Sequence, residues 1–554
     1  MKAVTAFTLF LLTASVTAEA QPKRDSVEAR KKASGAQARF EMVRRTNLPL
    51  SNSGSGGQCD ARIGRFCQWN SEDDTIEAKQ PRVIKRAREA LVASLDSQQR
   101  KSPRDGWITG QRIRYLIEAR NDTAALRVAR ECQAAEWWCA ALEGLALHEG
   151  GNGAGADSAF AHALRTMPSS ERCRWTDMTP LLDPALRSRF KKVGCGRNEH
   201  VAERLWWLAD PFWSLAGNDR RTEHYARHTM AKIQEPARNA YNLSWANDLR
   251  EMVVRYGWAR YWTRGAGNYM EPNNGPVSGH EATPNYHFVP VAVSADTMPA
   301  VKFDLDLSAS AERYSPVMAK RVFEIEPQIA VFRRGDSSLV VAAYDVTSRN
   351  ELDSTNVIGN LVIAHDEKSP AYQSTDNGKR RGALSVIVDS RPQIMSLEVV
   401  NFDSRHGAGW KRSILPLKPS VSGTVSLSDP LLFEATDSAV GDLDAAMKFA
   451  LGSNTVRRGK VGIYWETYGL AQSDSTQPIS LTLARVRVSA LRRLGESIGL
   501  ASRMSPLRIQ WNQVNGSTIA YRAMVLDLSL IPQGKYELRI ETGSAATTRT
   551  IEVR

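Results

Sequence analysis

The stretch EGLALHEGGNGAGADSAFAHALRTMP, residues 143–168, decides the fold of the N-terminal part of this 554-residue chain. Several of its residues repeat earlier ones at a constant offset of 34 positions. The matched pairs are Gly110 and Gly144, Ile113 and Leu147, Leu126 and Phe160, and Ala129 and Ala163. Small residues at fixed places let two helices approach closely, while large apolar residues fill the space between them. The period therefore predicts two stacked helical hairpins.

This pattern resembles the tetratricopeptide repeat, a helix-turn-helix unit of 34 residues. The positions that match the family's Gly, Ala, aromatic, Ala and Pro are Gly144, Ala156, Phe160, Ala163 and Pro168. The earlier copy departs from the family, because Asp122 replaces the small Ala and Leu126 the aromatic residue. The resemblance covers residues 103–170, and a helix over 83–95 is predicted to precede it. It implies an α-helical, tetratricopeptide-like repeat region, which we place at residues 59–200.

Fewer than three such repeats rarely stand alone, so the cysteines are of interest. They form three close pairs: Cys59 with Cys67, Cys132 with Cys139, and Cys173 with Cys195. Six cysteines allow 15 connectivities, of which sequence proximity favours these three local disulfides. The chain has no C-x-x-C pair, which disfavours structural zinc. Disulfides are typical of an oxidising compartment, and Cys132–Cys139 would join the two repeats at their boundary.

The N-terminus is typical of an exported protein. Residues 1–20, MKAVTAFTLFLLTASVTAEA, have a lysine, a short apolar run and a small-x-small end, which together predict a signal peptide. The apolar run is too short to span a bilayer, and no later stretch reaches about 18 apolar residues. We therefore predict no transmembrane anchor and a periplasmic or extracellular location. Residues 21–58 are charged and then rich in Ser and Gly, which predicts a flexible leader.

The net charge of +13 is spread along the chain in short groups such as KRARE at 85–89 and GKRRG at 378–382. A scattered charge of this kind is ordinarily a solvated surface. Nucleic acid is a poor partner for an exported protein, so we expect none. A protein partner in the cell envelope is favoured, and an anionic surface or a glycan is the alternative.

The densest chemistry of the chain is RLWWLADPFWSLAGNDRRTEHYARH, residues 204–228. His224 and His228 are one helical turn apart, so both would lie on the same face of a helix, as a pair of metal ligands must. The HExxH zinc motif needs a Glu directly after the first His, but Tyr225 stands there. The two histidines are the chain's candidate metal ligands. The favoured interpretation is that they pack and hydrogen-bond at a domain joint, with no cofactor.

Six tryptophans also gather in this part of the chain. They are Trp206, Trp207, Trp213, Trp245, Trp258 and Trp262. Aromatic clusters of this kind more often fill a core than stack against sugars or nucleobases. We therefore predict a packed layer between helices and a sheet, and a ligand platform is the alternative.

The order of a Trp-rich helix end, ADPFW, an Asn, EHYAR and then RYGWARYW is similar to the GWxTD domain of exported bacterial proteins. The matching positions are Asp210, Pro211, Asn218, Glu223, Tyr225, Arg227, Gly257 and Trp258. The family's Thr-Asp is missing, since Arg260 and Tyr261 follow the Gly-Trp. The resemblance implies a Trp-rich helical region over 201–289 with sandwich modules after it. It implies no particular reaction, because the family has no established activity.

From about residue 290 the pattern becomes one of strands and turns. Segments with alternating apolar and polar residues or of strand length include 301–307, 337–348, 382–390, 395–404, 460–470 and 535–541. Period two with Gly, Asp, Ser and Pro breaks predicts antiparallel, immunoglobulin-like β-sandwich modules, at 290–425 and 426–554. Residues 416–423 read as a linker. In the last segment, Tyr536, Leu538 and Ile540 should share one face.

Together these features predict a multidomain chain, α-helical first and β-sandwich afterwards. The favoured function is a non-enzymatic scaffold of the cell envelope that binds a protein partner through its repeats and sandwiches. No nucleophile elbow, P-loop or dinucleotide fingerprint occurs, and no catalytic residue is predicted. The alternatives are an envelope hydrolase or polymer-modifying enzyme with its site near Asp219, His224 and His228, and a carbohydrate-binding protein.

Overall fold

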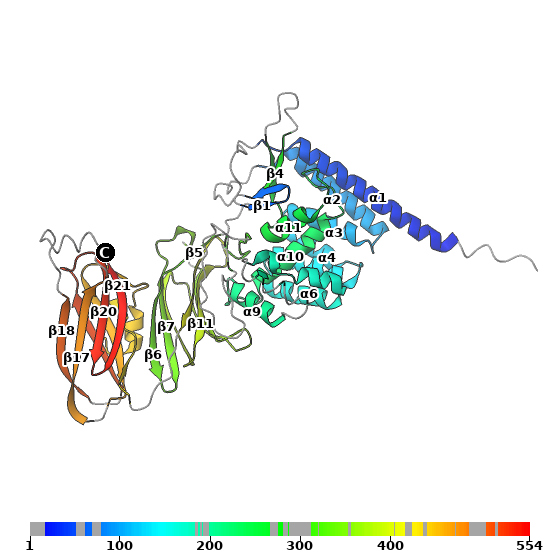
Figure 1. The fold of residues 1–554 in the computed structure, drawn as a ribbon. Helices are drawn as coiled ribbons and strands as arrows, with labels where there is room; N and C mark the ends of the chain where they lie inside the picture. Colours follow the sequence, from blue (N-terminus) through cyan, green and yellow to red (C-terminus); the bar gives the residue numbers. More distant parts are fainter. Residues whose placement is uncertain are drawn as a thin grey trace, which may run out of the picture. The chain divides into compact units, whose positions relative to one another are not determined.

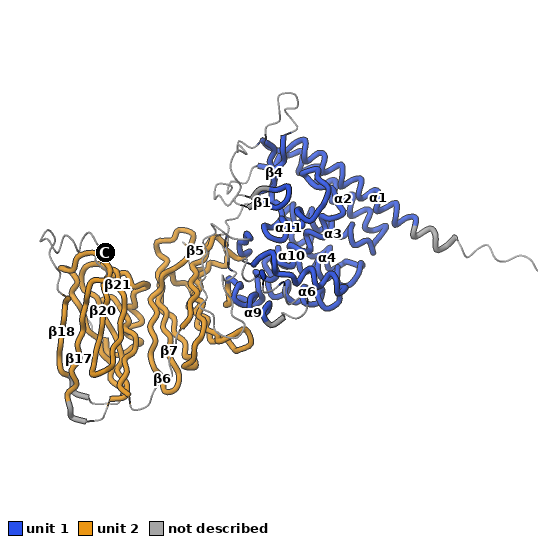
Figure 2. The backbone as a smooth tube through the Cα atoms, in the orientation of Figure 1, with its two compact units in different colours: residues 1–211, 215–291, 306–317 blue, residues 212–214, 292–305, 318–554 orange. Residues whose placement is uncertain are grey.

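The predicted order of helices followed by antiparallel β-sheets is confirmed in the computed structural model (Figure 1). The structure describes residues 17–50, 61–68, 79–182, 187–188, 191, 195, 199–265, 275–280, 286, 288, 312–319, 321–352, 356–403, 405–415, 424–435, 440–470, 473–486, 506–515 and 519–554. Figure 2 shows two compact units, residues 1–211, 215–291 and 306–317, and residues 212–214, 292–305 and 318–554. Among the helices so described, none is long and apolar enough to cross a membrane.

The first unit is mainly helical. Its helices are α1 (Thr17–Thr46), α2 (Arg82–Lys101), α3 (Gly106–Glu118), α4 (Asp122–Arg130), α5 (Glu136–Glu149), α6 (Gly153–Thr166), α7 (Ser169–Trp175), the short η2 (Thr179–Leu181), α9 (Glu199–Ala209), α10 (Asp219–Gln234) and α11 (Asn247–Tyr256). Two small antiparallel hairpins accompany them, β1 (Ala61–Ile63) with β2 (Phe66–Gln68) and β3 (Tyr261–Arg264) with β4 (Val277–His280).

Two helical hairpins, α3–α4 and α5–α6, hold the repeated residues in equivalent places. Asparagine side chains cap the second helix of each hairpin, Asn121 for α4 and Asn152 for α6. Gly144 on α5 faces the ring of Phe160 on α6 so closely that a Cβ there would lie 2.8 Å from the ring. The small residue and the large one therefore fit together between the helices, as the period predicts.

The predicted flexible leader over 21–58 is wrong for the residues that the structure describes, because α1 runs from Thr17 to Thr46. Ala29, Ala33 and Phe40 form a buried stripe on α1, and Arg44 is fully buried against Glu118. The high charge of this segment concealed a face of small apolar residues at helical spacing. Residues 1–16 of the predicted signal peptide and 51–58 of the leader lie outside the described part of the chain.

Two of the three predicted disulfides are confirmed, Cys132–Cys139 and Cys173–Cys195. Cys132 follows the end of α4 and Cys139 lies in α5, so this bridge joins the two hairpins. The remaining prediction, Cys59–Cys67, cannot be placed on the fold because Cys59 lies outside the described residues.

Removing the disulfides should destabilise the helical unit in the order of the loops that they close. The bridged residues are 7 positions apart in Cys132–Cys139 and 22 apart in Cys173–Cys195. Chain entropy predicts losses of about 2–3 and about 3–4 kcal/mol respectively. Thermal unfolding of the two double Cys→Ser variants tests this order, and a larger loss for the shorter loop would contradict it.

The second unit contains two β-sandwiches. The first is formed by β5 (Val322–Glu324), β6 (Gln328–Arg334), β7 (Ser337–Asp345), β8 (Val357–Ala364), β9 (Tyr372–Asn377), β10 (Arg381–Asp389), β11 (Gln393–Asn401) and β12 (Ala408–Leu415), with the short η3 (Asn350–Leu352) after β7. Its sheets have the orders β10-β7-β6 and β5-β12-β11-β8-β9, and among the described strand pairs of this sandwich only β5–β12 is parallel. Both sheets contribute to one core, which includes Tyr344 from one and Leu397 from the other.

The second sandwich is formed by β13 (Ser426–Leu427), β14 (Leu431–Glu434), α12 (Leu443–Lys448), β15 (Thr455–Val456), β16 (Lys460–Tyr468), β17 (Ser473–Arg485), β18 (Leu507–Asn515), β19 (Ile519–Asp527), β20 (Gly534–Thr542) and β21 (Ala545–Val553). In one sheet, β16 pairs with β13 and β14 and also with β19. The other sheet has the order β15-β21-β20-β17-β18. Tyr536, Leu538 and Ile540 are all buried, as predicted. A further cluster that includes Phe332 and Phe433 packs the two sandwiches together. The predicted strand at 301–307 and linker at 416–423 lie outside the described residues.

Candidate functional site

Helix α10, which carries both candidate metal ligands, is an interior helix. Asn218 caps its N-terminus by accepting from Arg221 N at 2.8 Å, and also donates to the carbonyl of Trp206 at 2.6 Å. Twelve of its 16 residues are buried, so the helix has almost no solvent face. It packs against α3, α5 and α6 of the two hairpins.

The first helices of the two hairpins supply the surface that α10 covers. Gln111 on α3 donates to the Ile233 carbonyl at 2.6 Å, which fixes the C-terminal part of α10. A Cβ on Gly110 would lie 3.2 Å from the side chain of Ile233. Helix α10 of the same chain therefore packs on α3 and α5, the first helices of the two repeats.

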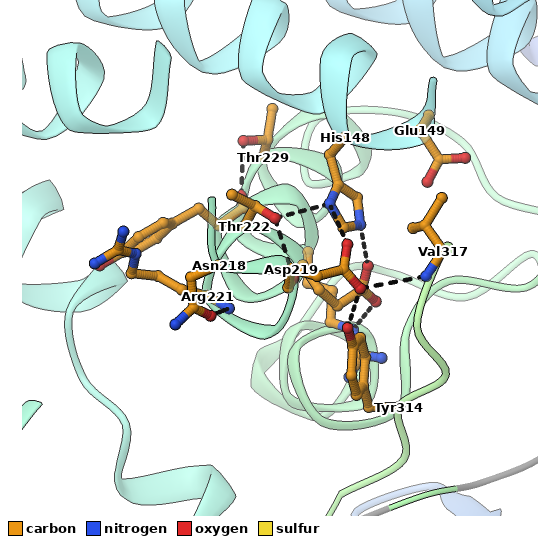
Figure 3. A network of polar contacts seen from close by, with 12 residues as sticks. His148, Glu149, Asn218, Asp219, Arg221, Thr222, Thr229, Tyr314 and Val317 are labelled. Atoms are coloured by element: carbon orange, nitrogen blue, oxygen red, sulfur yellow. Dashed lines mark hydrogen bonds and ion pairs between the residues drawn. The ribbon is translucent and has the colours of Figure 1, made fainter. Parts of the chain in front are cut away.

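A network of buried polar groups joins α5 to the N-terminal half of α10 (Figure 3). His148 on α5 contacts the Glu223 carboxylate at 2.7 Å through Nε2 and the Thr222 hydroxyl at 3.0 Å through Nδ1. The carboxylate of Asp219 accepts hydrogen bonds from the Tyr314 hydroxyl and from the Val317 backbone N–H. These contacts link residues up to 98 positions apart in the sequence.

The pKa values of this network follow from burial and from charge pairing. Burial disfavours a charged His148, but its hydrogen bond and ion pair with Glu223 raise its pKa overall. For Glu223, burial is opposed by Arg227 and then by His148, which hold the carboxyl pKa far below its ordinary value. Burial raises the pKa of Asp219, although His148 and Tyr314 act against it. When His148 is protonated, it and the Glu223 carboxylate form a charged pair inside the unit.

The positions that resemble the GWxTD family come together around this network. Glu223 pairs with Arg227, whose other donors reach the carbonyls of Val254, Arg255 and Arg313. Gly257 ends α11 with a φ of 81°, a conformation that glycine adopts most readily.

The remaining matched positions pack around the same helices. Trp258 is buried, and Arg260 lies 4.5 Å above its ring while pairing with Glu149 at 2.6 Å. Arg260, which departs from the family pattern, is thus accommodated by a carboxylate of α5. Tyr225 packs against Phe160, and Asp210 is buried beside Pro211.

His224 and His228 lie together, as their spacing predicts, but inside an aromatic core. His224 is fully buried, and its Nε2 contacts the Trp175 carbonyl at 2.9 Å. The His228 ring stacks on Trp175 and lies 4.7 Å from the His224 ring. Burial lowers the pKa of His224 well below its ordinary value and that of His228 to about 3. Within the described part of the chain, no group of three metal-binding side chains includes them.

Several groups of this site were not predicted from the sequence. His148 directly follows a repeated apolar position, Leu147, and nothing in its neighbours marks it. Tyr314 and Val317 come from a segment without clear periodicity. Only their contacts with Asp219 give them a role, so no local signal could have found them. Asp219 was named only as part of the site of the alternative hydrolase hypothesis.

The buried histidines predict a stability maximum near pH 6.5, the ordinary histidine pKa. At lower pH the unfolded chain binds protons at His224 and His228 that the folded unit does not. The free energy of unfolding should then fall by up to about 1.4 kcal/mol per pH unit for each histidine. The raised pKa of His148 changes the free energy of unfolding in the opposite direction. Its stabilising contribution is present below about pH 6.5 and is lost as pH rises through the folded pKa.

Urea unfolding over a pH series tests both arms of this profile. In the His224→Gln/His228→Gln variant, the free energy of unfolding should depend less on pH below about pH 6.5, the acid arm of the profile. In the His148→Gln variant, it should depend less on pH above about pH 6.5, the alkaline arm. An acid arm that is unchanged in the double variant would show that these two histidines are not buried and neutral.

Comparisons with known proteins assign this chain to no family. No family model and no curated protein matches it. Among solved structures, fibronectin domains FN1–FN3 of chicken CNTN1 are 10% identical, with 42% of this chain and 68% of that chain covered and a TM-score of 0.15. The receptor tyrosine kinase Torso is 7% identical, with 42% of this chain and 75% of that chain covered and a TM-score of 0.13. Red sea bream transglutaminase is 10% identical, with 41% of this chain and 31% of that chain covered and a TM-score of 0.13. These distant likenesses say nothing about function. The chain is a helical unit built on two hairpins, joined to a unit of two β-sandwiches.

Proposed function

We propose that this chain is an exported, non-enzymatic scaffold of the cell envelope that binds a protein partner. The signal-like N-terminus and the two disulfides support export, because disulfides persist in oxidising compartments. The β-sandwich modules fit this proposal, since many cell-surface domains share the sandwich architecture. The similarity of residues 201–289 to the GWxTD domain belongs to the same proposal.

The observation that carries this proposal is the burial of the chain's densest polar cluster. His148 is 1% exposed and His224 is fully buried, and their neighbours Glu223 and Arg227 are bonded to each other. A general acid or base must reach its substrate directly or through one water. Groups that are enclosed and bonded in this way hold α5, α10 and α11 together, and they are poorly placed to meet a substrate.

Cross-linking in cells tests the proposed function. Photo-reactive residues would replace Arg127 on α4 and His162 on α6, whose side chains are 64% and 42% exposed. A third probe at the exposed Lys535 on β20 would report on the second unit. One dominant protein cross-linked to these probes supports a scaffold. Cross-links only to glycan or to the chain itself would contradict it, as would turnover of peptide, ester or glycan substrates by the purified protein.

A further inference from the structure

A pocket of about 490 Å³ opens in the helical unit beside the C-terminal end of α10. Its walls come from α1, from the N-terminal ends of α3 and α5, and from the residues that follow α10. Trp107, Trp137 and Trp138 supply most of its aromatic surface. A volume of this size suits a few side chains of a bound ligand. Here the face of α3 and α5 extends beyond the end of α10.

Two of the three indole rings of this pocket have a cation over one face. The guanidinium of Arg30 lies 4.3 Å from the ring centroid of Trp107, and the ammonium of Lys232 lies 5.5 Å from that of Trp137. A sugar that stacks on tryptophan needs an open ring face, and these cations each occupy one. The pocket therefore presents positive charge beside its apolar surface.

Charge in the lining favours an anionic ligand. The residues that line the pocket include three cations and one carboxylate. The cations are Arg30, Arg104 and Lys232. The carboxylate, Glu235, is already paired with Arg250 at 2.7 Å. Asp105 and Glu171 pair with Arg30 and Lys232 from outside the lining, which holds both cations in place and leaves them further N–H donors.

Backbone donors lie at the same place. No side chain of the described residues caps α5 at Ala135, so its first backbone N–H groups have no side-chain partner there and the positive end of the helix dipole is not compensated by a cap. Glu136, the acidic residue of that turn, pairs with His162 at 2.9 Å. A carboxylate near the mouth of the pocket would meet cations and backbone N–H donors together.

We infer that this pocket binds an acidic peptide segment of a protein partner, with an aromatic or large aliphatic side chain inserted among the tryptophans. This inference rests on the proposed function and names the surface and the chemistry of the partner. Tryptophan and arginine dominate the binding energy of many protein interfaces, and both line this pocket. The peptide's Asp or Glu side chains would pair with Arg104 and Lys232 at the rim.

A random dodecapeptide library displayed on phage, selected on the purified full chain, supplies the probes. We expect the enriched peptides to combine Asp or Glu with Trp, Phe or Leu. Fluorescence anisotropy with fluorescein-labelled copies would then give affinities that weaken as salt increases. Trp137→Ala and Arg104→Glu should each lower the affinity at least about tenfold. Arg127→Glu, a charge reversal at an exposed arginine of α4, should change it less than about twofold.

Arg104 is exposed, so its variant tests the pocket without endangering the fold, which circular dichroism would confirm. The inference fails if no acidic peptides are enriched, or if both pocket variants bind them as the unaltered chain does. It also fails if a sulfated oligosaccharide occupies the pocket and acidic peptides do not. A protein partner that cross-links at Arg127 or His162 and binds both pocket variants normally would leave the proposed function intact and overturn this inference alone.

Discussion

We expect the Arg227→Met variant to lose about 3–5 kcal/mol of free energy of unfolding in the helical unit, the loss typical of breaking a buried ion pair. The Arg227 side chain is 4% exposed, pairs with Glu223 and donates to three backbone carbonyls. Methionine fills a similar volume but supplies no donor. Among the described residues, the variant leaves His148 as the remaining hydrogen-bond partner of the buried Glu223 carboxylate. It also removes the guanidinium donors from three backbone carbonyls, those of Val254, Arg255 and Arg313.

Hydrogen exchange of the α10 and α11 amides, read by mass spectrometry, measures this loss where it arises. The matched control is Arg127→Met, which removes an exposed arginine and should change the free energy of unfolding by less than about 0.5 kcal/mol. Adding Glu223→Gln to Arg227→Met should recover part of the loss, because the unpaired charge is then removed. A loss below about 1 kcal/mol would mean that Arg227 is hydrated and the network is open.

The Phe160→Ala variant should lose a similar amount, about 3–5 kcal/mol, by creating a cavity in the core of the repeats. Phe160 is 1% exposed, contacts Gly144 on α5 and packs against Tyr225 on α10. One side chain thus connects both helices of its hairpin with the helix that covers them. Thermal unfolding measures the effect, and His162→Ala on the exposed face of the same helix is the control.

The opposite change at the same contact gives an independent result. Gly144→Ala should also destabilise the unit, because its Cβ would lie 2.8 Å from the Phe160 ring. If both variants unfold like the unaltered chain, the helices are not packed through this pair and the repeat register is wrong.

The β-sandwiches were the most predictable part of the chain. Strand periodicity is local, so residues such as Tyr536, Leu538 and Ile540 disclose a buried face without knowledge of what covers it. The repeat period likewise placed Gly144 beside Phe160. The helix α1 was missed because most of its buried apolar residues are alanines, and because buried Arg44 finds partners far away in the sequence, such as Glu118.

The functional site was less predictable for a similar reason. The spacing of His224 and His228 places them on one face of α10, but local sequence cannot tell whether that face meets solvent or Trp175. The partner of Glu223 is His148, 75 residues earlier, and no periodic pattern joins them. The motif positions could be found from sequence, whereas their pairing depends on the tertiary fold.

The most direct test of the structural role of residues 204–228 is modification of the folded protein by diethyl pyrocarbonate, with each histidine followed by mass spectrometry. His162 and His365, whose side chains are 42% and 31% exposed, should react readily. His148, His224 and His228 should stay unmodified until denaturant unfolds the helical unit. Reaction of His224 or His228 in the folded protein as fast as that of His162 would show an accessible site, and would contradict the burial of these two histidines in the helical unit.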